Sequence, residues 1–239
     1  MKSPSDFDCL SDRELLTLLH FWFFPIKLFW QEPWKTVRIT GMKATQTLPE
    51  NYCFDSKFDL KNKKLLIWLN VIGLFLTIFF LSLFGKIAIW LRGDLGESTF
   101  FSINGPGDIL LKLAGIFLIV ILVMVLHEGV HGFFFWLFTH HMPVFGIKTG
   151  YAYAAMPGWY FQRNQYLIIG LAPFVILNVL GIIFLALVPV GWLWVVLGSL
   201  LMNSSGAVGD FAVVFWLLCK PATSLAMDKA DSIELYTPA

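Results

Sequence analysis

The stretch Val125-Leu126-His127-Glu128-Gly129-Val130-His131-Gly132 lies inside a long apolar run, residues 114–138. The length of that run and its lack of other charged residues predict a membrane-spanning helix. Residues four apart share one face of a helix, so His127 and His131 can hold one metal ion between them. Glu128 follows about 100° further round the helix, where its carboxylate can reach a water on that ion. Two neutral imidazoles with a carboxylate base form the His-Glu-x-x-His arrangement of zinc sites.

A packing role is the alternative interpretation of these polar residues. An ionisable side chain at membrane depth costs roughly 2.5–3.5 kcal/mol on insertion scales, so its presence needs a reason. Apolar residues flank the motif on both sides, which leaves no solvated helix face. A buried polar trio packed against other helices stays open as an interpretation. The metal site explains the cost of burying these groups better.

The composition indicates an integral membrane protein. Hydrophobic residues make up 57% of the chain and charged residues 14%, against about 45–50% and about 25% in ordinary soluble domains. The net charge is +1, and no basic cluster is interleaved with aromatic residues, so no nucleic-acid partner is predicted. The three cysteines, Cys9, Cys53 and Cys219, cannot form a disulfide framework.

The hydropathy pattern predicts an all-α membrane protein, a bundle of about four transmembrane helices. The expected spans are about 65–88, 109–138, 165–187 and 192–218, within a transmembrane domain of residues 65–219. Residues 1–64 are expected to form a cytoplasmic and interfacial N-terminal segment, and residues 220–239 a cytoplasmic tail. The apolar stretch 15–30 is interrupted by His20, Pro25 and Lys27. It predicts an interfacial helix, with a re-entrant or spanning segment as the alternative.

The distribution of Lys and Arg predicts the orientation. Most of these residues lie before the first span, between the second and third spans, and after the fourth. The positive-inside rule therefore places both termini in the cytoplasm. We expect a multi-pass protein of the cell (plasma) membrane, in contact with the lipid bilayer.

Asp210 is the candidate for a third metal ligand. A catalytic zinc takes three protein ligands and keeps one position for water. Within residues 165–218, Asp210 and Tyr166 carry the ionisable side chains. At 1.5 Å per residue, His127 and Asp210 both lie about 27–29 Å from the starts of their helices, so they match in depth. Small residues around both positions favour close helix approach. A buried carboxylate bonded to Ser or Asn is the alternative interpretation of Asp210.

Two further features have two interpretations each. Asn203 lies about two turns before Asp210. It either binds a substrate backbone or makes an ordinary interhelical contact. The alternation Tyr151-Ala152-Tyr153-Ala154 fits a strand edge that an extended substrate joins. It also fits an interfacial loop whose tyrosines lie at headgroup level.

At the His-Glu-x-x-His motif and at residues 203–210, the sequence resembles the site-2 class of membrane-embedded proteases. It more closely resembles a small family of integral membrane proteins called putative zincin peptidases. The resemblance extends over roughly residues 60–235 and includes Pro157-Gly158-Trp159-Tyr160 and Leu171-Ala172-Pro173. It implies Zn²⁺ bound by His127, His131 and Asp210, with Glu128 as the base, and proteolysis within or beside the membrane.

The sequence therefore predicts a zinc metalloendopeptidase, a hydrolase that cleaves a peptide bond in or near the membrane. Glu128 would activate a zinc-bound water, and the substrate would be a membrane protein or a peptide. The alternative is a non-catalytic metal-binding membrane scaffold or regulator. The presence of Glu128 favours the enzyme, because a purely structural metal site does not need this carboxylate.

Overall fold

Four long apolar helices dominate the computed structural model, which describes residues 44–93, 105–148 and 151–239. They are α1 (Lys63–Arg92), α2 (Pro106–Thr139), α3 (Arg163–Leu187) and a fourth segment over Val190–Leu218. Each is long and apolar enough to cross a membrane. Within these described residues the protein is mostly helical with four candidate spans, as predicted. The interfacial helix predicted within residues 15–30 lies outside the described residues.

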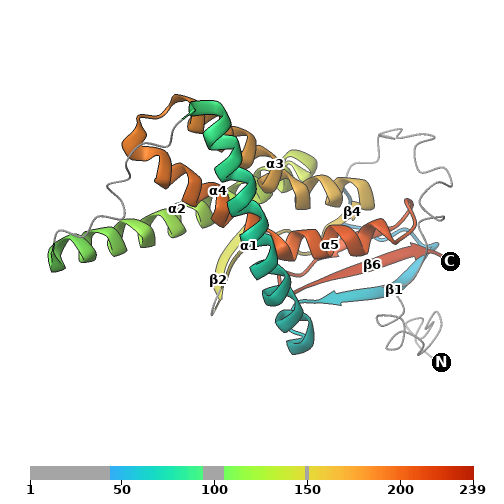
Figure 1. Ribbon diagram of the computed structural model, residues 1–239. Coiled ribbons are helices and arrows are strands. Elements are labelled where there is room, and N and C mark those ends of the chain that lie inside the picture. The colour runs from blue at the N-terminus through green and yellow to red at the C-terminus, as the bar shows by residue number, and fades with distance from the viewer. Residues whose placement is uncertain (1–43, 94–104, 149–150) are drawn as a thin grey trace.

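The fourth span is bent and consists of three pieces. A 3₁₀ turn, η3 (Val190–Trp192), leads into α4 (Leu193–Gly206), and α5 (Val208–Leu218) follows. Ser205 donates its hydroxyl hydrogen to the Leu201 carbonyl at 2.7 Å, and Gly206 comes next. Such Ser and Gly residues bend helices, and Figure 1 shows α4 and α5 running in different directions. The bend places Asp210 in the first turn of α5.

Two small sheets accompany the helices in the part of the chain that the structure describes, so the prediction of an all-α protein was wrong on this point. One is antiparallel, in the order β1-β6-β5-β4, with strands β1 (Tyr52–Asp59), β4 (Tyr160–Gln162), β5 (Leu225–Asp228) and β6 (Ser232–Pro238). The other is the hairpin of β2 (Val144–Lys148) and β3 (Tyr151–Ala155). In the larger sheet Tyr52 pairs with Pro238. Local hydropathy patterns cannot reveal a pairing between segments so far apart in the chain.

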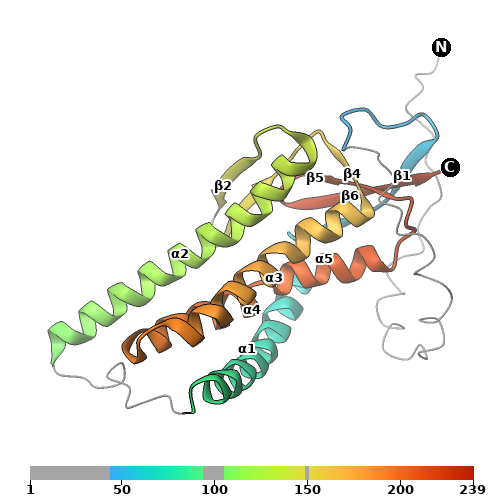
Figure 2. The ribbon, with the colours of Figure 1, turned by 90° about the horizontal axis from the view of Figure 1, so that it is seen from above.

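The four-stranded sheet lies at one end of the helices, where α2 and α5 end and α3 begins (Figure 2). A buried cluster joins this sheet to the three helices. It includes Phe135 of α2, Tyr166 and Ile169 of α3, Leu217 of α5, and Phe161, Ala226 and Leu235 of the strands. A second buried cluster, away from the sheet, joins α1, α3 and α4. The sheet therefore fixes the relative positions of the helix ends that carry the polar motif.

Candidate metal centre

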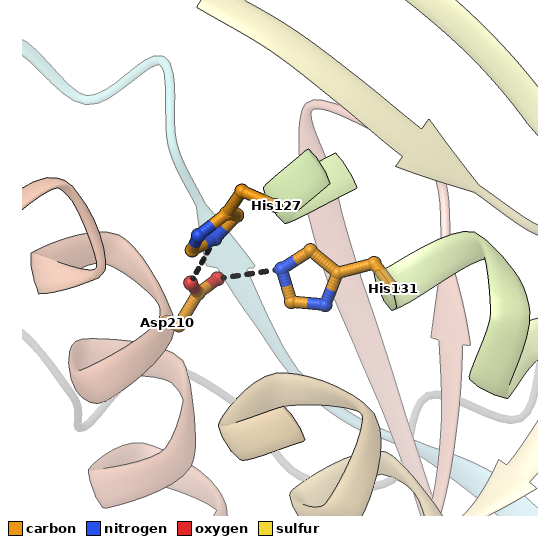
Figure 3. Close-up of side chains that lie close together, drawn as sticks. All are labelled: His127, His131 and Asp210. Atoms are coloured by element: carbon orange, nitrogen blue, oxygen red, sulfur yellow. Dashed lines mark hydrogen bonds and ion pairs between the residues drawn. The ribbon is translucent and has the colours of Figure 1, made fainter. Parts of the chain in front are cut away.

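His127 and His131 of α2 are turned towards Asp210 of α5 (Figure 3). His127 Nε2 lies 3.0 Å from Asp210 Oδ2, and His131 Nε2 lies 3.4 Å from Asp210 Oδ1. The potential ligand atoms of the three residues all lie within 4.8 Å of one another. The structure thus brings together two neighbouring turns of one helix and the first turn of another.

The three side chains lie close enough together to share one zinc ion. Zinc binds nitrogen and oxygen ligands at about 2.0–2.2 Å, so tetrahedral angles separate two ligand atoms by roughly 3.3–3.5 Å. One oxygen of Asp210 lies 3.0 Å from His127 Nε2, the other lies 3.4 Å from His131 Nε2, and all three ligand atoms lie within 4.8 Å of one another. Two histidines and one carboxylate also match the donor set of a three-ligand catalytic site. His127, His131 and Asp210 are therefore positioned to bind a metal ion.

Both imidazoles use their other nitrogen to bond a neighbouring helix. The Nδ1 of His127 lies 3.0 Å from Asn203 Oδ1, and the Nδ1 of His131 lies 2.9 Å from the Ile169 carbonyl oxygen. An oxygen acceptor at Nδ1 favours the tautomer with its hydrogen there, which leaves Nε2 free as a metal ligand. Asn203 and Ile169 thus orient the two histidines.

The Ile169 carbonyl is available because of Pro173, which lies inside α3. In a regular helix the N–H of residue 173 would donate to the carbonyl of residue 169, but proline has no N–H. The freed oxygen accepts from His131 instead. The Pro173 carbonyl in turn accepts from Asn203 Nδ2 at 3.4 Å. The carbonyls of Ile169 and Pro173 therefore hold His131 and Asn203, and Asn203 in turn contacts His127.

Glu128 reaches the hairpin instead of the two histidines. Its Oε2 accepts a hydrogen bond from the Ala154 backbone N–H of β3 at 2.7 Å. The hairpin comes this close because residue 132 is glycine. A Cβ there would lie only 2.3 Å from the Phe145 ring of β2. Two residues of α2 therefore position the hairpin: Glu128 bonds it through its carboxylate, and Gly132 leaves the space in which it packs.

A cavity of about 420 Å³ contains these groups. Its walls include the metal trio, which is His127, His131 and Asp210, and also Glu128. Strand β3, side chains of α3 and the turn between β5 and β6 also contribute to the lining. Tyr166 of α3 donates its phenol hydrogen to Asp228 Oδ2 at 2.6 Å, and both residues line the cavity. Burial raises the pKa of Asp228, while hydrogen bonds from Tyr166 and the Ala230 amide oppose that rise. Asp228 therefore adds a third carboxyl group, besides those of Glu128 and Asp210, to the wall of the same cavity.

Asp231, in the β5–β6 turn, ties the hairpin to the rest of the protein. Its carboxylate accepts from Lys148 of β2 and, at 2.6 Å, from the Tyr151 hydroxyl of β3. Lys61 lies 2.8 Å from its other oxygen. The hydrogen bond from Lys148, with those from Lys61 and Tyr151, holds the pKa of Asp231 well below its usual range. The hydrogen bond that Tyr151 donates to Asp231 raises the pKa of Tyr151 to about 12.

The sequence identified most of the polar groups but not their surroundings. His127, His131 and Asp210 come together, and Glu128 lines the same cavity. Asn203 contacts His127, and its proposed role in binding substrate stays a prediction. Sequence reasoning missed the Ile169 carbonyl and Asp228. A proline four residues after Ile169 in an apolar helix is a signal that could have found the first. Nothing local marks the second.

The described part of the chain thus has four helices long and apolar enough to span a membrane, and a His-His-Asp group that could hold a metal ion beside a glutamate. The family model described as putative zincin peptidase matches residues 120–225. This is the family that the sequence was found to resemble, and over these residues the chain is similar to it. The match includes the metal trio, Pro173 and Asn203, and it ends before Asp228. No curated protein and no solved structure gives a significant match.

Proposed function

We propose that this protein is a membrane-embedded zinc metallopeptidase that hydrolyses a peptide bond in or near the membrane. The carrying observation is the convergence of His127 Nε2, His131 Nε2 and the Asp210 carboxylate in a cavity that Glu128 also lines. The family match over residues 120–225 supports the same reaction class. A purely structural zinc site has four protein ligands and no open position. Here the trio supplies three, which leaves room for a water.

Glu128 is the residue that moves the proton in this proposal. Zinc held by the trio would act as a Lewis acid for the scissile carbonyl and would lower the pKa of water beside it. Glu128 takes a proton from the attacking water and delivers it to the leaving amine. The bond from the Ala154 N–H, 2.7 Å long, holds one carboxylate oxygen and leaves the other for the water. Asn203 and Ile169 keep the two imidazoles in the ligand orientation.

The edge of β3 offers a place for an extended substrate. β3 pairs with β2 along one edge, and its Ala154 N–H points to the other edge, where it bonds Glu128. Backbone groups alternate along a strand, so the N–H and carbonyl of Ala152 face that same edge. A peptide added there would lie directly beside the proposed base. The pairing of β3 with β2 supports this binding mode over that of an interfacial loop.

The substrate is a membrane protein or peptide, because the cavity is built between apolar spans. β1 precedes α1, β6 follows α5, and the two strands pair, so both flanking segments lie at one end of the helices. Lys61, Lys63, Lys64 and Lys220 gather at that end, which the positive-inside rule assigns to the cytoplasm. We therefore place both termini in the cytoplasm, the protein in the cell membrane, and the cleavage near the cytoplasmic surface.

The test compares purified full-length wild type with Glu128→Gln in detergent micelles. Zinc content is measured by elemental analysis, and cleavage of a mixture of single-span transmembrane peptides is measured by mass spectrometry. Both proteins should retain one zinc, and Glu128→Gln should cleave about 10²–10⁴-fold more slowly, the usual loss for a general base. Glu50→Gln, at an exposed glutamate before β1, is the matched control and should behave as wild type.

Two results would contradict the proposal. Wild type that contains no zinc would remove the metal centre. Zinc in both proteins, with no peptide cleaved by either, would favour the non-catalytic metal-binding scaffold.

A further inference from the structure

Tyr166 and Asp228 form a buried polar pair that the proposed chemistry does not use. Their side chains belong to α3 and β5, and their residues are 5% and 7% exposed. The O–O distance between them is 2.6 Å, and both line the cavity that contains the metal trio. Burying two such groups is costly, so they are expected to serve either the packing of α3 on the sheet or the contents of the cavity.

The hydrogen bonds around Asp228 fix the direction of the phenol hydrogen. Asp228 Oδ1 accepts from the Ala230 N–H at 2.6 Å, and Oδ2 accepts from Tyr166. A carboxylate with a donor on each oxygen acts as an acceptor, so the phenol hydrogen is committed to Asp228. The phenol oxygen then presents lone pairs and no hydrogen. Among the described residues, no donor to that oxygen accompanies the bond to Asp228.

An extended peptide in this cavity needs such an acceptor. A strand added to β3 uses only every second backbone N–H and carbonyl on that edge. The alternate N–H groups face other walls of the cavity, where a buried donor without a partner weakens binding. The wall formed by α3 and the β5–β6 turn supplies Tyr166, whose oxygen can only accept.

We propose that Tyr166 is a substrate-binding residue, whose phenol oxygen accepts a backbone N–H of an extended peptide, and that Asp228 is the positioning residue that fixes the phenol. The inference rests on the proposed function for the peptide itself. It assigns a role to Asp228 at the end of β5, which lies beyond the family match. It also gives the strand pair after α5 a part in recognition as well as in folding.

The test measures binding rather than turnover. The probes are short capped peptide hydroxamates, which bind zinc, each paired with twins in which one backbone amide is replaced by an ester. Their affinities for zinc-loaded, full-length protein are measured by titration calorimetry in detergent. At one position the ester should weaken binding to wild type about tenfold, the effect of one lost hydrogen bond. The same replacement should not change binding to Tyr166→Phe.

Two further variants separate recognition from packing. In Asp228→Asn the amide can donate to the phenol oxygen and occupy its lone pair, so the amide peptide should bind as weakly as its ester twin binds wild type. Tyr236→Phe is the matched control. Its hydroxyl also donates to a carboxylate, Glu234 Oε2 at 2.8 Å, but it does not line the cavity. This variant should keep the tenfold ester effect, and all variants should keep their zinc.

An ester effect of equal size in wild type, Tyr166→Phe and Asp228→Asn would overturn the inference, as would no effect at any position. Absence of hydroxamate binding to zinc-loaded wild type would overturn it too. Failure of the proposed function gives a different result. A protein that shows the predicted ester pattern but cleaves no peptide retains the Tyr166 role and loses the enzymatic one. A protein that cleaves peptides without any ester effect retains the enzymatic role alone.

Discussion

The cavity has two kinds of wall, and they are built in different ways. The metal wall consists of α2 and α5, with His127, Glu128, His131 and Asp210. The sheet wall consists of β3 and the β5–β6 turn, with Asp228 buried in it and Asp231 tied to the hairpin. Helical spacing sets three of the four polar groups of the metal wall. Pairing between segments from distant parts of the chain sets the sheet wall.

In the proposed function, this difference separates chemistry from recognition. The metal wall lies inside the family match, whereas the β5–β6 turn lies beyond it. Substitutions in the metal wall should therefore change metal binding and leave the sheet intact. Substitutions in the sheet wall should change the position or the contacts of a peptide and leave zinc in place. The predictions below test this separation.

The largest effect is expected for Asp210→Ala. Removing a direct ligand should lower the affinity for zinc by more than about 100-fold, beyond the 10–100-fold typical of outer-shell residues. The measurement is zinc affinity by competition with a chelator. Amide hydrogen exchange of β1 and β6 should stay as in wild type, because the sheet does not depend on the metal.

Asp55→Ala is the control for that experiment, since Asp55 bonds Ser56 and Lys220 away from the cavity. Full zinc affinity in Asp210→Ala would remove Asp210 from the ligand set. Loss of protection in β1 and β6 would contradict the independence of the two walls.

Pro173→Ala is expected to have a smaller effect on zinc affinity, and an effect of opposite sign on helix stability. The new N–H can donate to the Ile169 carbonyl and compete with His131 Nδ1, so zinc affinity should fall by roughly three- to tenfold, at the low end of outer-shell effects. Helix stability should rise, because proline is costly inside a helix. Zinc competition and thermal unfolding measure the two changes, and the ¹⁵N shifts of His131 report its tautomer.

Pro189→Ala, at the start of η3, is the matched control and should leave zinc affinity unchanged. If Pro173→Ala binds zinc as tightly as wild type, with the same His131 shifts, the proline has no role in orienting the ligand.

The sequence could predict the metal wall because its information is local. His127 and His131 lie four residues apart, and Asp210 stands out as a carboxylate in an apolar span at matching depth. The number of spans follows from hydropathy in the same way. The sheet wall could not be predicted, because β5 is four residues long and its partners lie elsewhere in the chain. The Tyr and Ala alternation at 151–154 fitted either an edge strand or an interfacial loop, and it did not indicate a bond to Glu128.

The bend in the fourth span is another feature that the sequence could not predict. Ser204, Ser205 and Gly206 indicated close helix packing. In the structure, Ser205 and Gly206 also lie at the end of α4. Composition revealed that small residues belong there. Only the tertiary structure shows that the resulting change of direction places Asp210 against His127.

The smallest effect is expected for Asp231→Asn, which weakens the tie between the hairpin and the β5–β6 turn. The amide keeps the shape of the side chain but removes the charge that Lys148 and Lys61 contact. Exposed ion pairs contribute little, so hydrogen exchange in β2 and β3 should rise by roughly fivefold at most. Zinc content should not change. Asp55→Asn is the matched control, because it also loses a lysine contact but does not touch the hairpin.

The pKa of Asp231 determines the pH range in which this carboxylate holds the hairpin. The pKa of Asp231 is lowered in the folded protein, first by the hydrogen bond from Lys148. Its contribution is therefore complete above the ordinary aspartate pKa of about 3.9 and is lost only as the pH falls through the lower, folded value. Tyr151, with a pKa of about 12, remains a donor throughout. After correction for intrinsic exchange, wild type and Asp231→Asn should differ equally at pH 7 and pH 5. A difference that already disappears between those values would mean that another titrating group holds the hairpin closed, and the sheet wall would then depend on the metal wall beside it.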